Sequence, residues 1–253
     1  MKEIIMSVLE ENALLAAFAV VGITVYISYT LSDKLTRGRL HGSAIAIIIG
    51  LILAYIGGIQ TNGEKGLADI PMFAGIGVMG GAMLRDFAIV STVFGASLSE
   101  VKQTGVRGFV GLLIGIFLQF FSGVFVALSF GYSDPVALTT IGAGAVTYIV
   151  GPVTGAAVGA SSDVIALSIA AGVLKSILVM TTTPFAAKFI GLDNPRTAMI
   201  YGGVMGTASG VAAGLAATDA KLVPYGAMTS TFHTGIGCIL CPSILFLITK
   251  ALF

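Results

Sequence analysis

Charged side chains are scarce in this sequence of 253 residues. Lys, Arg, Asp and Glu together make up 10% of the chain, and hydrophobic residues make up 56%. Soluble domains carry about 25% charged residues, so a soluble fold of this composition would lack the side chains to cover its surface. With a mean hydropathy of +1.01, the composition predicts an all-α polytopic membrane protein lying in a lipid bilayer.

A basic surface is also missing. The formal net charge is +1, so nothing favours binding to nucleic acid, which needs clustered Lys and Arg. The sequence holds no Walker A motif, no H-E-x-x-H and no nucleophile elbow, and we therefore expect neither an enzyme nor a bound cofactor. Gly75, Gly77 and Gly80 match G-x-G-x-x-G, but without a preceding strand in a βαβ unit the match is due to chance.

Cysteine occurs only at Cys238 and Cys241, as C-x-x-C in "TGIGCILCPS". A redox pair needs a low-pKa thiol at an exposed helix start in a soluble α/β unit. Because this motif lies inside an apolar run, small core residues are the better interpretation.

Long apolar runs fill most of the chain, and a spanning helix needs about 20 such residues. We expect about eight membrane segments in one integral membrane domain over residues 1–253, with N-terminal spans in 1–106 and repeated units in 107–253. The segments are 12–31, 42–59, 70–94, 107–130, 139–162, 164–190, 198–217 and 223–253.

The orientation rests on a small charge bias. The densest basic cluster lies at 34–39, and the positive-inside rule places it in the cytoplasm. Alternation then puts both termini outside, together with Lys188 and Arg196. Six Lys or Arg fall inside and five outside, so the bias amounts to one residue.

Three hydrophilic breaks resemble one another. Asp69, Asp134 and Asp193 each stand one or two residues before a Pro, and a glycine cluster follows. Asp-Pro and Asn-Pro suit helix starts, where the polar side chain caps free N–H groups. Internal repeats with Gly- and Pro-interrupted apolar segments indicate the binding site of a secondary transporter.

The glycine-rich segments 139–162 and 198–217 have two interpretations. Gly151, Gly155 and Gly159 share a four-residue spacing that lets neighbouring helices approach closely, and packing alone could explain them. Pro152 and the surrounding hydroxyls point instead to discontinuous helices. A break at membrane depth is tolerated where protein or a cavity covers it, and the exposed helix ends then suit a small anion and Na⁺.

These segments supply the candidate site. The candidate substrate-binding residues are Thr147, Tyr148, Thr154, Gly155, Lys175, Thr207 and Ser209. Gly151 and Gly206 are candidate Na⁺ ligands near the expected unwinding points. Lys175 either pairs with a substrate carboxylate or is held by carbonyl groups, and His233 is either a proton carrier or a hydrogen-bonded core residue. Arg85 and Asp86 are expected to neutralise each other.

Four stretches resemble a known family over nearly the whole chain. They are "LTRGRLHGSAIAIIIGLILAYIGG", "KGLADIPMFAGIGVMGGAMLRDFAIV", "TTIGAGAVTYIVGPVTGAA" and "AATDAKLVPYGAM", and they are similar to the MadM subunit of the bacterial malonate:sodium symporter. The resemblance implies a multi-pass protein of the bacterial inner membrane that imports malonate with Na⁺ together with a small MadL-like membrane subunit. It leaves open the stoichiometry, a higher oligomer, and elevator or rocking motion.

A fainter likeness supports an alternative. "ALSIAAGVLKSILV" and "IGLDNPRTAMIYGGVMGTASGVAAG" resemble LrgB/CidB membrane proteins, which implies a holin-type protein or an exporter of glycolate or another monocarboxylate. Gly210 follows Ser209 where that family usually has His, so a role resting on that His does not transfer.

Overall fold

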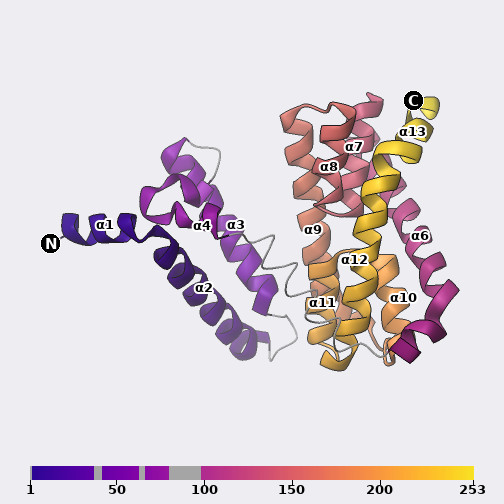
Figure 1. The fold of residues 1–253 in the computed structure, drawn as a ribbon, viewed down its shortest axis with the longest axis horizontal. Coiled ribbons are helices and arrows are strands. Elements are labelled where there is room, and N and C mark those ends of the chain that lie inside the picture. Colours follow the sequence, from indigo (N-terminus) through magenta and orange to yellow (C-terminus); the bar gives the residue numbers. More distant parts are fainter. Residues whose placement is uncertain (1, 37–41, 63–65, 80–97) are drawn as a thin grey trace. The chain divides into compact units, whose positions relative to one another are not determined.

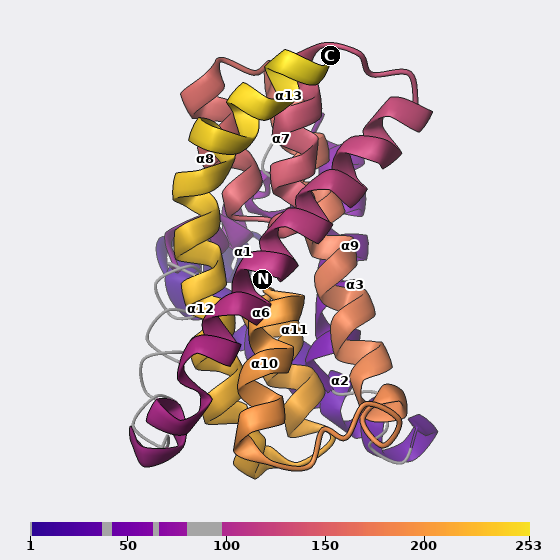
Figure 2. The ribbon, with the colours of Figure 1, turned by 90° about the vertical axis from the view of Figure 1, so that its right-hand side faces the viewer.

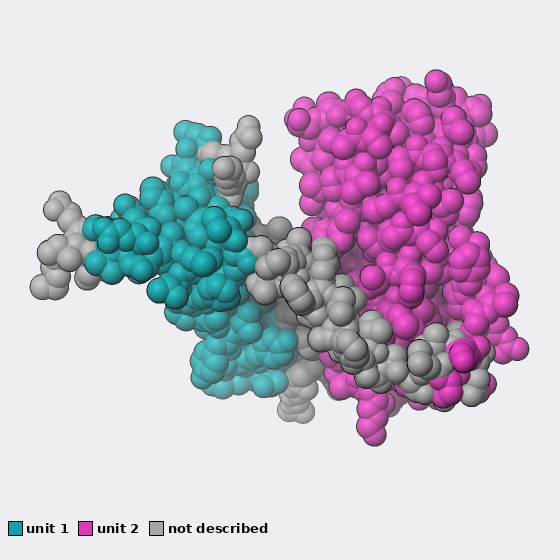
Figure 3. All heavy atoms as spheres, viewed as in Figure 1, with its two compact units in different colours: residues 1–88 teal, residues 89–253 magenta. Residues whose placement is uncertain are grey.

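The computed structural model describes residues 2–36, 42–62, 66–79 and 98–253, and no strand occurs in these ranges. The all-α prediction is therefore confirmed for the described part. Contacts divide the chain into two compact units, residues 1–88 and 89–253, which Figure 3 colours separately. Each unit is described by itself, and a single domain over 1–253 stays a prediction.

The first unit is built on two long helices that pack against each other. Gly57 lets the backbone of Leu67 cross close by, since a β-carbon there would lie 2.7 Å from the Leu67 nitrogen. Arg85 and Asp86 lie outside the described residues, as does the rest of the predicted span 70–94 beyond residue 79. The elements are α1 (Lys2–Glu11), α2 (Ala13–Thr36), α3 (Gly42–Thr61), η1 (Gly66–Asp69), η2 (Pro71–Phe73) and α4 (Gly75–Val78).

The second unit holds three long helices, α6, α9 and α12, and two pairs of short ones. Figures 1 and 2 show α7 and α8 in its upper half and α10 and α11 in its lower half. The elements are α6 (Leu98–Ser129), α7 (Pro135–Val146), α8 (Val150–Val158), α9 (Ser162–Ala186), α10 (Pro195–Met205), α11 (Ala208–Ala216), η3 (Ala220–Leu222), α12 (Val223–Leu240), η4 (Cys241–Leu245, a π-helix) and α13 (Phe246–Leu252).

Helices α7 and α8 form an antiparallel hairpin. A β-carbon on Gly151 would lie 2.9 Å from the Cα of Gly144, and one on Gly155 would lie 2.8 Å from the Cγ2 of Thr140. Residues later in α8 therefore lie beside residues earlier in α7, which shows that the chain reverses direction between the two helices. The spaced glycines of α8 therefore serve close packing within this hairpin and against Ile165 and Ser168 of α9.

Helices α10 and α11 form a second hairpin, which straddles α12. A β-carbon on Gly226 of α12 would lie 2.9 Å from Val211 Cγ1 on α11 and 3.3 Å from the Ala198 carbonyl oxygen on α10. Both arms thus lie at the same level of α12, although their chain directions are opposite.

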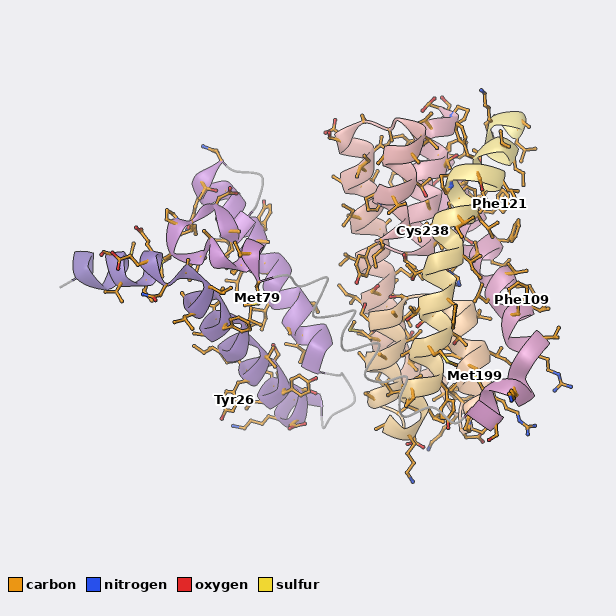
Figure 4. All side chains as sticks on the ribbon, viewed as in Figure 1. Tyr26, Met79, Phe109, Phe121, Met199 and Cys238 are labelled. Atoms are coloured by element: carbon orange, nitrogen blue, oxygen red, sulfur yellow. The ribbon has the colours of Figure 1, made fainter. Side chains whose placement is uncertain are left out.

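The two hairpins pack against opposite ends of α6. A β-carbon on Gly123 would lie 2.9 Å from the Cα of Gly142 on α7, and one on Gly115 would lie 2.8 Å from the Cα of Val204 on α10. Figure 4 shows Phe121 on α6 in the upper half and Met199 on α10 in the lower half. The hairpins enter from opposite ends and their tips meet near the middle.

The sequence predicted that 139–162 and 198–217 each cross the membrane, whereas each of them folds back on itself. Pro152 does not break a helix: it lies in the first turn of α8, where the missing N–H has no helical partner to lose. The count of eight crossing segments is not confirmed. Within the described residues, the helices long and apolar enough to cross a membrane are Ala13–Leu35, Gly105–Ser129, Ser162–Ala186 and Ala220–Leu252.

Two of the three predicted repeats begin alike. Asp134 caps α7 by accepting a hydrogen bond from the Ala137 amide at 2.9 Å, and Asn194 caps α10 with a full capping box. Pro follows each cap. In the first copy, Asp69 ends η1, and the residue before η2 is Ile70, which makes no side-chain cap. The dipeptide rule therefore predicts the starts of both hairpins in the second unit.

A main apolar core lies between α6, α7, α8 and the C-terminal helices. Phe120, Ile116 and Val150 are among its fully buried members. Cys241 belongs to the same cluster and Cys238 packs against it, as expected for small core residues; Figure 4 labels Cys238 on α12.

Candidate functional site where the hairpin tips meet

The tip of the first hairpin is built around Thr147, which adopts an extended conformation with φ −156° and ψ 156°. Its hydroxyl accepts hydrogen bonds from the amides of Ile149 at 3.3 Å and Val150 at 3.1 Å, which begins α8. Because the Val150 amide is used in this way, it does not close a helical bond to the carbonyl of Val146. That carbonyl, the last of α7, is left for another donor.

The tip of the second hairpin is built around Gly206 and Thr207. Gly206 has φ +70°, in the left-handed region, and ends α10. The Thr207 hydroxyl accepts from the Gly210 amide at 3.4 Å, which begins α11, and lies 2.5 Å from the Ser176 hydroxyl of α9. This pair ties the second tip to the middle of α9.

A polar bridge joins the two tips. The ammonium group of Lys175 donates to the carbonyl oxygen of Val146 and, at 2.5 Å, to Gln119 Oε1. Gln119 Nε2 donates to the carbonyl oxygens of Val204 and, at 3.0 Å, Met205. One lysine and one glutamine thereby satisfy the terminal carbonyls of α7 and α10, which have no partner within their own helices.

Four helix ends meet at this level. The C-termini of α7 and α10 each carry about half a negative charge, and the N-termini of α8 and α11 each carry about half a positive charge. Lys175 lies beside the negative ends. Within the described ranges, no carboxylate forms an ion pair with it, so the helix ends provide its compensation.

A groove of about 510 Å³ opens beside the bridge. Its walls come from α6, α7 and α9, with Met205 from α10, and most of its lining is apolar. Gln119 and Lys175 lie together at its polar part, along with Ser122. The remaining lining residues are Leu118, Gly123, Val126, Ile141, Ala145, Ala171, Leu174, Leu178, Val179 and Met205.

His233 of α12 lies against the second tip. Its side chain is fully buried, and Nδ1 lies 2.7 Å from the Gly203 carbonyl oxygen. Since a carbonyl accepts, Nδ1 carries the proton, and Nε2 has no hydrogen-bond partner in the described structure. The hydrogen-bonded core interpretation of His233 agrees with this geometry.

The structure brings together some predicted site residues and separates others. Thr147, Tyr148, Lys175, Gly206 and Thr207 lie at or beside the tips. Ser209 lies in the first turn of α11. All of these residues lie at or near the helix ends.

Three predicted residues lie within α8. Gly151 is the second residue of the helix, as Ser209 is of α11, and it packs against Gly144. Thr154 is fully buried with an unpartnered hydroxyl, and Gly155 packs against Thr140.

Gln119 and Ser176 belong to the site but were not among the predicted residues. Gln119 stands alone as an amide in the apolar run "IGIFLQFFSG". An isolated amide at membrane depth needs a partner, and this pattern could have indicated it.

Two hairpins that enter from opposite ends, with their helix ends at the middle, are features of secondary transporters. Among the described residues, no group of three or more His, Cys, Asp or Glu could hold a metal. The hairpins and their helix ends are those expected of a helical membrane protein of the secondary-transporter class.

The chain belongs to the malonate/sodium symporter MadM subunit family, whose model matches residues 5–253. Family membership implies a subunit of a malonate/sodium symporter, with Na⁺ as the coupling ion. Comparison with curated proteins and with solved structures gave no match.

Proposed function

We propose that this chain is the substrate-translocating subunit of a Na⁺-coupled malonate importer in the bacterial inner membrane, acting with a small MadL-like membrane subunit. The observation that carries the proposal is the meeting of four helix ends at the hairpin tips. Two positive ends and two negative ends at one level supply positions for an anion and a cation without a cluster of charged side chains.

The anion position lies at the N-termini of α8 and α11. First-turn amides have no partner within their own helix. The Thr147 hydroxyl accepts from the Val150 amide at the start of α8, and Thr207 is the N-cap of α11. Tyr148 and Ser209 stand beside these starts. Malonate carries two carboxylates on one carbon, which matches two helix N-termini facing one site. Thr154 and Gly155 remain proposed contributors from the next turn of α8.

The hairpins leave the proposed orientation of the second unit unchanged but move the loop between α9 and α10 to the other side of the membrane. At the end where α9 leads to α10, the basic residues of the unit gather: Lys102, Arg107, Lys188, Arg196 and Lys221. The opposite end carries Lys250. The positive-inside rule then places the basic end in the cytoplasm.

Lys188 and Arg196 thereby move to the cytoplasmic side, because α7–α8 turns back rather than crossing. Hairpin α10–α11 enters from the cytoplasm and α7–α8 from outside. The eight proposed segments thus include two re-entrant hairpins, one open to each side. Such a pair suits alternating access around a central site.

Uptake into proteoliposomes that contain this chain and its partner subunit tests the function. We expect an inward Na⁺ gradient to drive accumulation of labelled malonate, and an equal K⁺ gradient to fail. Collapse of the Na⁺ gradient with a Na⁺/H⁺-exchanging ionophore should abolish accumulation. Malonate uptake that is the same in Na⁺ and K⁺ would contradict the coupling, and liposomes with either subunit alone test the need for the partner.

A further inference from the structure

We infer that the ammonium group of Lys175 occupies a monovalent cation site, formed by the carbonyl oxygen of Val146 and Gln119 Oε1, and that Na⁺ and Lys175 exchange there. The inference rests on the proposed function for the identity of the ion. It assigns Lys175 to the cation position, whereas the sequence placed it among the substrate ligands and placed Na⁺ at Gly151 and Gly206.

The first argument is the chemistry of the position. The groups around the ammonium are oxygen acceptors: a main-chain carbonyl at the C-terminus of a half-helix and an amide oxygen. Terminal carbonyls of interrupted helices are the ligands that transporters use for Na⁺. The amide of Gln119 is held in its orientation, because Nε2 donates to Val204 and Met205 and so directs Oε1 towards Lys175.

The second argument is charge. The C-terminus of α7 carries about half a negative charge, and the ammonium group of Lys175 donates directly to its last carbonyl oxygen, that of Val146. Within the described part of the chain, Lys175 has no carboxylate to stabilise it. Removing the ammonium would leave the Val146 carbonyl oxygen and Gln119 Oε1 without their donor, and a Na⁺ ion carries the same charge in a smaller volume.

The third argument is that the groove offers space for the Lys175 side chain when its ammonium group leaves the site. Lys175 and Gln119 both line the 510 Å³ groove between α6 and α9, so the lysine can leave the carbonyl without repacking the core. A carboxylate that binds near Lys175 would draw the ammonium towards itself and free the oxygen position. Na⁺ and the anion would then favour the same state of the protein, which is positive coupling between two ligands.

The test measures Na⁺ binding without malonate and without transport, by the rise in melting temperature of the purified complex as Na⁺ replaces K⁺ at constant ionic strength. In the wild type, Na⁺ competes with Lys175. If the ammonium leaves the site about one tenth of the time, Lys175→Met should lower the half-saturating Na⁺ concentration by about tenfold. Lys250→Met, at the far end of the unit on α13, is the matched control and should change nothing.

A second variant locates the site. Adding Gln119→Leu to Lys175→Met removes one proposed ligand and should raise the half-saturating Na⁺ concentration again by severalfold. Tight Na⁺ binding that persists in this double variant would overturn the location. If Lys175→Met binds Na⁺ as tightly as the wild type or more weakly, the proposed exchange between Na⁺ and the Lys175 ammonium is wrong. This conclusion would stand even if malonate uptake is still driven by Na⁺.

Folding of the variant is itself informative. Lys175→Met that is monodisperse in Na⁺ but aggregates in K⁺ supports the site, because Na⁺ replaces the lost charge. Failure to fold in both salts, also for Lys175→Gln, shows that Na⁺ does not replace the ammonium and overturns the proposal. Conversely, a gain in Na⁺ affinity without Na⁺-driven uptake would retain the site and refute the proposed function.

Discussion

The imidazole ring of His233 lies where a side chain of residue 206 would be: a β-carbon on Gly206 would be 2.5 Å from its Cε1 atom. The same ring is held by its Nδ1 contact with Gly203, 2.7 Å away on α10. The second hairpin tip therefore packs closely against α12 because Gly206 has no side chain and the imidazole ring of His233 fills the space that one would occupy. Helix α12 and the tip of the second hairpin therefore pack directly against each other.

Gly206→Ala should destabilise the protein more than a left-handed glycine normally does. An alanine with φ +70° is strained by about 1 kcal/mol or more, and the ring of His233 must also move. Gly191→Ala is the matched control, since Gly191 has φ +63° and open space around its β-position. Thermal unfolding should show a larger loss for Gly206→Ala, and His233→Ala should recover part of it. Equal losses at the two glycines would contradict the role of the ring.

Thr147→Val should weaken the start of α8. It removes the hydroxyl that accepts from the Ile149 and Val150 amides, and loss of such a cap costs about 0.5–2 kcal/mol. We expect a lower melting temperature and impaired malonate uptake. Thr147→Ser keeps the acceptor and should behave like the wild type. Unchanged stability in Thr147→Val would refute the capping role.

Ser209→Ala should affect uptake without affecting stability. Ser209 is half-buried in the first turn of α11, and its hydroxyl makes no hydrogen bond to the rest of the described chain. A substrate ligand at this position would raise the KM for malonate severalfold and leave the melting temperature in place. Transport kinetics equal to those of the wild type would remove Ser209 from the site.

Labelling of single cysteines can decide the orientation of the hairpins. In a background with Cys238→Ala and Cys241→Ala, Ser133→Cys reports the loop before α7, and Asp193→Cys reports the loop before α10. Both loops are exposed. Hairpins entering from opposite ends predict that a membrane-impermeant maleimide labels residue 133 in intact cells and residue 193 only after lysis. Labelling of both in intact cells would favour crossing segments instead.

The class of fold and two of its helix starts could be predicted from the sequence, because both depend on residues that are close together in the chain. Scarce charge and long apolar runs predict that the chain lies in lipid. Because lipid offers no hydrogen-bond partners, the backbone groups must be satisfied within helices. Polar residues before Pro135 and Pro195 mark two helix starts, because caps act over a few neighbouring residues. Thr147 and Thr207 could be chosen because hydroxyl side chains gather around the glycine-rich interruptions.

The reversal of the chain at the two hairpins and the pairing of distant residues could not be predicted from the sequence, because both depend on tertiary packing. Whether a chain continues or turns back after an interruption depends on its neighbours, here Gly144 against Gly151 and Gly226 between two arms. Lys175 could be noticed in the sequence, but its partner Gln119 is 56 positions away, and no spacing rule connects them. The sequence by itself determined an all-helical membrane protein with helix starts at two hairpins; only the tertiary structure decided that the hairpins meet, because long-range packing places their helix ends at one level.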